Sequence, residues 1–158
     1  MDAPVIIVGG GPVGLSLALA LARYSVRSIV LERNAAPVQE SRALVIWPRT
    51  QEILRDWNVY DALREAGDFV TDFTAINALN ERRLIALDFS VLNDVVRDPG
   101  MLIIPQNETE RVLRELVAAN PHCEFRTGIE VTGVTQDTEY ADVRFADASG
   151  TGTIRGSC

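Results

Sequence analysis

Pro4-Val5-Ile6-Ile7-Val8-Gly9-Gly10-Gly11-Pro12-Val13-Gly14 joins a β-branched run to a cluster of glycines near the start of the chain. The β-branched run predicts a strand buried on both faces. Pro12 suits the first turn of a helix, where a missing N–H is harmless, and the aliphatic residues that follow predict a buried helix from Val13 to Arg23. A second strand, expected over Arg27–Glu32, completes a βαβ unit with two parallel strands.

The glycines satisfy the pattern G-x-G-x-x-G between this strand and this helix. The first glycine permits the tight turn, the second lets a pyrophosphate approach the backbone, and the third lets the helix pack closely on the strand. Free N–H groups and the positive end of the helix dipole then stabilise the phosphates. The predicted cofactor-binding residues of this turn are Gly9, Gly11, Pro12, Val13 and Gly14.

A carboxylate follows the second strand at the distance that a dinucleotide-binding unit requires. Glu32 lies 18 residues after Gly14, where it can accept both ribose hydroxyls of an adenosine. Alternatively, Glu32 is a solvated strand end paired with Arg33. The complete βαβ context favours dinucleotide binding.

The region after Glu32 favours FAD over a nicotinamide cofactor. A nicotinamide-binding domain usually continues with further βα units directly after the acidic residue. Here a loop over 33–49, helices over 50–57 and 61–66 with Gly67 as C-cap, and a hairpin over 73–89 are expected before the next buried strand at 101–104. Such an insertion is typical of a flavin enzyme whose substrate region interrupts the nucleotide domain.

The rest of the chain completes an α/β fold. We expect a helix over 107–119, opened by a capping box from Asn107 to Glu110, a strand over 123–127 that returns to the parallel sheet, and a meander over 131–135, 143–145 and 151–155. The predicted fold is a Rossmann-like FAD-binding βαβ sheet with an antiparallel β-meander and the start of an inserted β-rich substrate region. The FAD-binding domain would comprise 1–67 and 101–158, and the insertion 68–100.

Composition excludes several classes of function. The chain of 158 residues has a formal net charge of −7 and a pI near 4.7, which argues against nucleic acid as a partner. One histidine and two separated cysteines predict neither a metal site nor a disulfide framework, and fit a reducing cytoplasm. Residues 5–22 carry no charge, but their central glycines and the lone preceding Asp2 argue against a membrane span or a secretory signal.

Three ordered blocks are similar to the flavoprotein aromatic hydroxylases of the para-hydroxybenzoate hydroxylase type. The first comprises 8–22 with 29–33, the second Ser41-Arg42-Ala43 with 48–54, and the third Ile104-Pro105-Gln106 with 110–113. The resemblance covers residues 4–156, and three blocks in order are far more specific than the glycine pattern alone.

The resemblance assigns a role in cofactor binding to each of five residues. It implies that Glu32 holds the adenosine ribose, that Arg33 flanks the adenine, and that Val131 meets the adenine through its backbone. Arg42 would neutralise the pyrophosphate or contact the ribityl chain, and Gln106 would hydrogen-bond the same region. The alternatives are a solvated loop residue for Arg42, a residue before the helix cap for Gln106, and plain core for Val131.

The implied activity is monooxygenation by bound FAD, with NAD(P)H as reductant and O2 and a phenol-like aromatic ring as substrates. No catalytic residue can be named, since His122 follows Asn-Pro in a turn and is expected at the surface. Alternatives are another FAD oxidoreductase of the same fold, such as a quinone-pathway hydroxylase or a polyene reductase, and a non-catalytic dinucleotide-binding module. A homo-oligomer is left open.

Two departures from the family carry expectations of their own. The family usually has glycine where this chain has Ser25, so the residue after the first helix is expected at positive φ and under strain. The family's later Asp-Gly and Gly-Asp blocks have no counterpart among the 158 residues. We therefore expect a piece of a longer enzyme that is inactive in isolation.

Overall fold

The computed structural model describes residues 5–36 and 45–157. The chain divides into two compact units: residues 1–40 with 109–158, and residues 41–108. Unit 1 contains the glycine turn, and unit 2 contains residues 68–100, the predicted insertion in the nucleotide domain.

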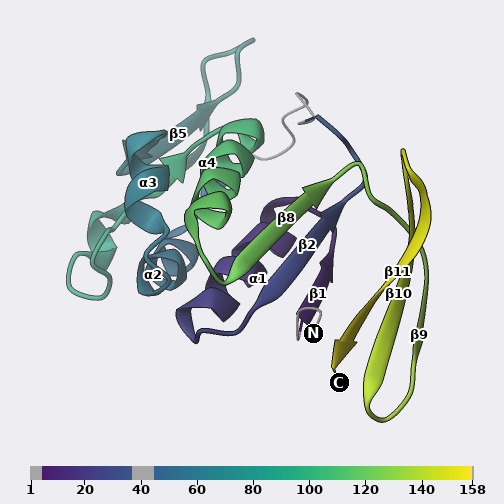
Figure 1. Ribbon diagram of the computed structural model, residues 1–158. Helices are drawn as coiled ribbons and strands as arrows, with labels where there is room; N and C mark the ends of the chain where they lie inside the picture. The colour runs from purple at the N-terminus through teal and green to yellow at the C-terminus, as the bar shows by residue number, and fades with distance from the viewer. Residues whose placement is uncertain (1–4, 37–44, 158) are drawn as a thin grey trace. The chain divides into compact units, whose positions relative to one another are not determined.

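Unit 1 is built on a parallel sheet of three strands in the order β1-β2-β8. β1 (Val5–Val8) pairs with β2 (Ser28–Glu32), and β2 pairs with β8 (Cys123–Thr127), both in parallel. Helix α1 (Pro12–Arg23) connects β1 to β2 (Figure 1). The predicted βαβ unit and the return of 123–127 to the parallel sheet are confirmed, and the fold is the expected Rossmann-like α/β fold.

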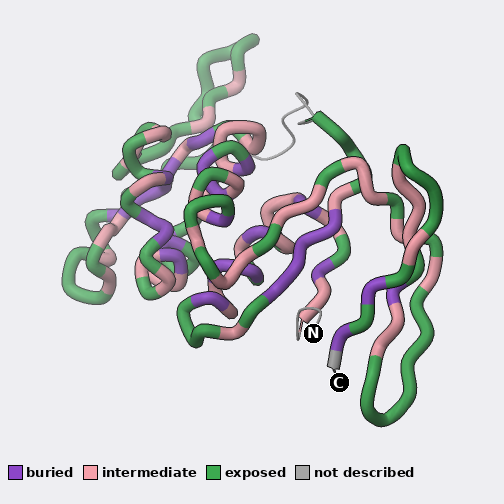
Figure 2. The backbone as a smooth tube through the Cα atoms, in the orientation of Figure 1, coloured by how far each residue is buried: buried purple, intermediate pink, exposed green. Residues whose placement is uncertain are grey.

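β2 is the buried centre of this sheet, whereas β1 is an edge strand among the described residues. Ser28, Ile29, Val30 and Leu31 are all buried, which Figure 2 shows as a continuous buried segment. In β1 only Ile7 is buried, and Val8 is 57% exposed. The prediction that this run is buried on both faces is therefore wrong, because β1 has a described partner strand on one side only.

The two faces of the sheet are covered by different elements. On one face lies α1, whose buried residues are Leu15, Ala18, Leu19 and Ala22. On the other face Ile29 and Leu31 of β2 pack against Val143 and Ile154. These belong to the meander β9 (Glu130–Gln136), β10 (Tyr140–Asp147) and β11 (Gly150–Ser157), which confirms the predicted antiparallel strands and extends each of them.

Unit 2 contains an antiparallel sheet in the order β3-β7-β4 and a separate hairpin. Its strands and helices are β3 (Val45–Ile46), α2 (Pro48–Asp56), α3 (Tyr60–Glu65), β4 (Asp68–Val70), β5 (Asp72–Ile76), β6 (Arg83–Asp88), η1 (Phe89–Leu92) and β7 (Met101–Ile103). Helix α4 (Gln106–Ala119) begins in unit 2 and continues in unit 1. The predicted hairpin, both short helices and the strand near 101–104 are confirmed.

Polar side chains tie the elements of unit 2 together. Buried Gln51 donates from Nε2 to the carbonyl oxygens of Ile46 and Gly100, at 2.8 Å each. Arg55 forms ion pairs with Asp98 at 2.5 Å and Asp61 at 3.1 Å, and its guanidinium lies 4.1 Å from the centroid of the Tyr60 ring. Burial raises the pKa of Tyr60, which keeps this phenol protonated.

Three local predictions in unit 2 are wrong. The expected loop over 33–49 includes β3, which forms by pairing with distant β7. Gly67 does not have the left-handed conformation of a glycine that ends a helix. A Cβ there would lie 2.8 Å from Leu102 Cδ1, so Gly67 instead permits a close approach to β7. Asn107 is no N-cap, because α4 begins one residue earlier, at Gln106.

None of the described helices combines the length and the hydrophobicity that crossing a membrane requires.

The residue after α1 has the predicted left-handed conformation, with φ of 58° at Ser25. Its N–H donates to the carbonyl of Ala22 at 2.9 Å, and the N–H of Val26 donates to Leu21 at 3.1 Å, so the helix ends in a tight reversal. A Cβ is unfavourable in this conformation, whereas glycine adopts it freely.

We expect Ser25→Gly to raise the free energy of unfolding by about 0.5–1 kcal/mol, because it removes this strain. The matched control is Ser16→Gly inside α1, which should lower it by a similar amount through lost helix propensity. Chemical denaturation of the three proteins measures both changes. A less stable Ser25→Gly variant would show that the serine hydroxyl contributes more than the strain removes.

Candidate functional site

The turn between β1 and α1 depends on the two glycines at its ends. Gly9 has φ of 106°, a conformation that side chains rarely adopt, and its N–H donates to the carbonyl of Leu31 at 2.8 Å. A Cβ on Gly14 would lie 2.0 Å from the carbonyl oxygen of Gly9. These two glycines therefore let α1 start directly against the end of β1, as the glycine pattern predicts.

Gly11 differs from Gly9 in conformation, and from Gly10 and Gly14 in what surrounds it. It is the N-cap of α1 with φ of −81° and ψ of −176°, an ordinary extended conformation. A Cβ built on it would have no atom within 4 Å. Neither strain nor crowding within the protein requires glycine here, and the open space beside its backbone is where a ligand could approach.

The first turn of α1 has the character of an anion site. No side chain caps it, and it contains no acidic residue. The backbone N–H groups of Val13 and Gly14 have no acceptor within the helix, because they belong to its first turn. Pro12, at the first helical position, has no N–H to offer. The amides and the helix dipole can thus stabilise a phosphate placed over Gly11.

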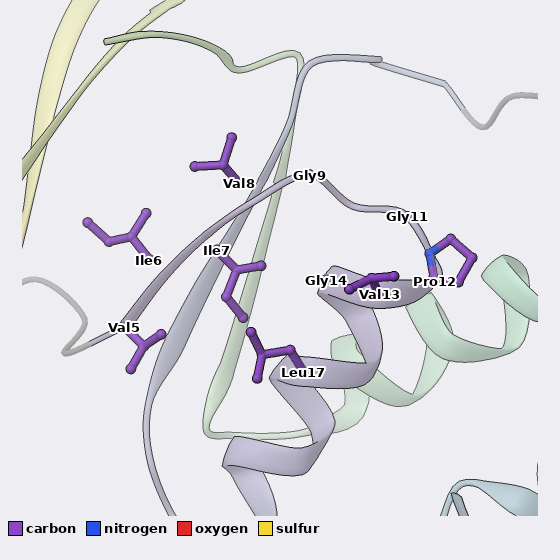
Figure 3. A pocket seen from close by; sticks show the side chains of 10 residues that line it. All are labelled: Val5, Ile6, Ile7, Val8, Gly9, Gly11, Pro12, Val13, Gly14 and Leu17. Carbon is purple, nitrogen blue, oxygen red and sulfur yellow. The ribbon is translucent and has the colours of Figure 1, made fainter. Parts of the chain in front are cut away.

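A pocket of about 480 Å³ lies along β1 and the turn, and Figure 3 shows its lining. It brings together all five predicted residues of the turn: Gly9, Gly11, Pro12, Val13 and Gly14. The other lining residues carry only hydrocarbon side chains: Val5, Ile6, Ile7 and Val8 from β1, and Leu17 from α1. The polar atoms that a ligand could contact at the turn are therefore mainly those of the backbone.

The carboxylate of Glu32 is held by two backbone N–H groups at the end of β2. Gly10 N donates to Oε2 at 2.7 Å, and Asn34 N donates to Oε1 at 2.9 Å. An ionised carboxylate has about four acceptor positions, so each oxygen can accept another hydrogen bond. Two adjacent hydroxyls of a ribose match this remaining capacity.

Gly10 is a site residue that the sequence analysis missed. A Cβ on it would lie 2.9 Å from Cβ of Glu32 and 2.7 Å from Cε2 of Phe125. Its lack of a side chain therefore allows its N–H to reach the Glu32 carboxylate. The available signal was a glycine at a position that the G-x-G-x-x-G pattern leaves free.

The other predicted residues are distributed along both units. Arg33 follows Glu32 and is exposed. Arg42 lies outside the described residues. Half-buried Gln106 is the first residue of α4, and its contact with the pyrophosphate side stays a prediction. The side chain of Val131 packs against the core shared by β2 and the meander, so only its backbone is a candidate for contact with an adenine.

The thiol of Cys123 lies on the α1 face of the sheet and is unsuited to nucleophilic chemistry. Its Sγ lies 3.5 Å from the carbonyl oxygen of Ala18 and is positioned to donate to it. Burial raises the pKa of the Cys123 thiol, and the hydroxyl of Ser28 opposes this only partly. The thiol thus stays protonated near neutral pH.

Comparison with known proteins gives the same family over nearly the whole chain. The family model described as "FAD binding domain" matches residues 2–157. Para-nitrophenol 4-monooxygenase from Pseudomonas sp. (strain WBC-3) is 30% identical over 151 residues, which cover 96% of this chain and 37% of that protein. Pentachlorophenol 4-monooxygenase from Sphingobium chlorophenolicum is 35% identical over 150 residues, covering 94% of this chain and 27% of that protein.

Solved structures show the same relationship. The p-nitrophenol 4-monooxygenase PnpA from Pseudomonas putida DLL-E4 superimposes with a TM-score of 0.91 at 30% identity, covering 98% of this chain and 39% of that one. Aklavinone-11 hydroxylase, in a ternary complex with FAD and aklavinone, superimposes with a TM-score of 0.84 at 25% identity. The match covers 98% of this chain and 31% of that one. This chain thus spans less than two fifths of the length of these relatives. It belongs to the FAD-binding domain family of the flavin-dependent aromatic hydroxylases.

Proposed function

We propose that this chain binds FAD across the glycine turn, with the pyrophosphate over Gly11 and the adenosine ribose on Glu32. The observation that carries the proposal is the contrast among the consecutive glycines: Gly11 faces open space beside the free amides of α1, while Gly10 directs its N–H to the ribose carboxylate. The site thereby offers donors to the phosphates and acceptors to the ribose hydroxyls, in the order that a dinucleotide presents them.

The remaining contacts are proposed from the family resemblance. Arg33 would flank the adenine, and the backbone of Val131 would meet its edge. Arg42 and Gln106 would contact the pyrophosphate and the ribityl chain.

The proposed domain organisation divides the chain into two regions. Residues 1–67 and 101–158 would form the cofactor domain, and 68–100 would begin the substrate region. Apolar side chains exposed on one face of the β5–β6 hairpin, including Phe73, Ile85 and Leu87, support a further layer over it.

The proposed activity of the whole protein is NAD(P)H-dependent hydroxylation of a phenol-like ring with O2. Its support is that the nitrophenol and pentachlorophenol enzymes among the relatives are monooxygenases. Bound FAD supplies the redox chemistry, while the residues of this chain bind and orient it. Cytoplasmic location stays a prediction from composition, a homo-oligomer stays open, and no catalytic residue is assigned within the chain.

The activity is tested with the full-length protein. We expect purified protein to contain FAD, and a phenol substrate panel to accelerate NAD(P)H oxidation together with formation of hydroxylated product. Acceleration without a hydroxylated product would indicate an uncoupled reaction or another flavin reductase of this fold. FAD binding without any NAD(P)H oxidation would favour the non-catalytic alternative.

Gly11→Val should abolish FAD binding while the fold stays intact. The valine side chain would enter the open space over Gly11, where the pyrophosphate is expected, and it meets no protein atom at its Cβ. The contrasting variant is Gly14→Ala, whose Cβ would collide with the Gly9 carbonyl and should lower stability by about 2–4 kcal/mol. Fluorescence quenching measures affinity, and thermal melting measures stability. Unchanged FAD affinity in Gly11→Val would contradict the assignment of the pyrophosphate to this turn.

Glu32→Ala should weaken FAD binding by about 1.5–3 kcal/mol, the scale of hydrogen bonds to a charged acceptor. The loss should be much smaller for flavin mononucleotide, because that ligand lacks the adenosine. Glu124→Ala provides the matched control, since this exposed carboxylate on β8 pairs with Arg126 instead. Equal losses for the two flavins would show that Glu32 does not bind the ribose.

A further inference from the structure

Phe125 lies on the same face of the sheet as Glu32. It is in register with Val30 of β2, and Thr127, two residues later, is in register with Glu32. Alternate residues of a strand point to the same face, and Cys123 on this face contacts Ala18 of α1. The half-buried ring of Phe125 therefore lies on the α1 side, near the carboxyl ends of the strands.

The ring is in direct contact with the backbone of the glycine turn. A Cβ on Gly10 would come within 2.7 Å of Cε2 and 3.0 Å of Cζ of Phe125. The same atom would lie 2.9 Å from Cβ of Glu32. The backbone of Gly10 thus fills the space between the aromatic ring and the end of β2.

The contact between Phe125 and Gly10 affects one hydrogen bond, the one that the N–H of Gly10 donates to Glu32. Gly10 has no side chain to restrict its backbone, so the direction of its N–H depends on what lies against it. That N–H donates to Oε2 of Glu32 at 2.7 Å, while Asn34 holds the other oxygen. Without the ring, Gly10 could turn its N–H away and release one side of the carboxylate.

We propose that Phe125 is a positioning residue for the ribose carboxylate. Its ring fixes Gly10, the amide of Gly10 fixes Oε2 of Glu32, and the remaining acceptor positions of the carboxylate stay directed at an adenosine ribose. The inference rests on the proposed function in one respect only, namely that Glu32 accepts the ribose. It predicts that Phe125 matters for ligands that contain adenosine and not for flavin mononucleotide.

The first test needs no flavin. Amide hydrogen exchange should show the Gly10 N–H protected in the parent chain and in Phe125→Leu, which keeps a large apolar side chain. Protection should fall in Phe125→Ala and in Glu32→Ala. The N–H of Leu15, which donates to Gly11 O at 3.0 Å within α1, is the internal reference and should not change. Undiminished protection of Gly10 in Phe125→Ala overturns the inference.

The second test is a double-mutant cycle in flavin affinity. Phe125→Ala should weaken FAD binding about tenfold, the consequence of one lost hydrogen bond, and leave flavin mononucleotide affinity unchanged. In a Glu32→Ala background, the same substitution should produce no further loss, because Phe125 acts through the carboxylate. Phe125→Leu should retain FAD affinity to within about threefold. If Phe125→Ala does not fold, Phe125→Val replaces it in both tests.

The outcomes separate this inference from the proposed function. If Glu32→Ala leaves FAD affinity unchanged, ribose binding by Glu32 fails, whereas the exchange of Gly10 still reports whether Phe125 fixes that amide. If Glu32→Ala weakens FAD binding and Phe125→Ala weakens it by the same factor in both backgrounds, the proposed function stands and the positioning role is overturned. Equal losses of FAD and flavin mononucleotide in Phe125→Ala also overturn it, because they would indicate general damage to the site.

Discussion

The close approach of Gly14 to the carbonyl of Gly9 is the contact on which the site depends. A single Cβ would fall 2.0 Å from that oxygen, so even alanine would push the start of α1 away from β1. With glycine, the helix begins directly at the end of the strand, and its first-turn amides lie at the carboxyl edge of the sheet. Ligands of open α/β sheets bind at this edge. One backbone contact therefore links packing of the helix to the placement of these amides, which are the proposed phosphate donors.

β2 transmits this arrangement to the second half of the site. Its residues Ser28 to Leu31 are buried between α1 and the meander, and its main chain also accepts the N–H of Gly9 at Leu31 and that of Ile129 at Glu32. Main-chain bonds on both sides therefore fix the strand end that carries the Glu32 carboxylate. Because Gly10 and Asn34 already orient the two carboxylate oxygens, the proposed binding of a ribose would cost little rotamer freedom.

Most of the features that the sequence predicted correctly depend on local spacing, and the return of β8 to the parallel sheet beside β2 is an exception. The glycine pattern, the βαβ unit, the β5–β6 hairpin and the meander each follow from residues close together in the chain, whereas the positive φ of Ser25 follows from the family resemblance. Most of the features that it missed depend on distant parts of the chain, whereas the start of α4 at Gln106 is a local error. β3 pairs with β7, Gly67 packs on Leu102 and Phe125 contacts Gly10, each across a large separation in sequence. The exposure of β1 reflects a described partner strand on one side only. Neither periodicity nor turn composition records such contacts.

Three consecutive glycines in one turn are explained by three different physical requirements. Two of these requirements concern folding, and the third, by our proposal, concerns ligand binding. Gly9 is required by its φ of 106°, and Gly10 by the crowding of Phe125 and Glu32. Neither requirement applies to Gly11, because its conformation is extended and the space around it is open. Ser, Asp or Asn would even stabilise an N-cap better than glycine does, by accepting a hydrogen bond from the helix amides. A capping side chain would, however, occupy the donors and the volume that a phosphate needs. Under the proposed binding mode, room for a phosphate accounts for the absence of a side chain at Gly11, whereas packing and backbone geometry explain it at Gly10 and Gly9.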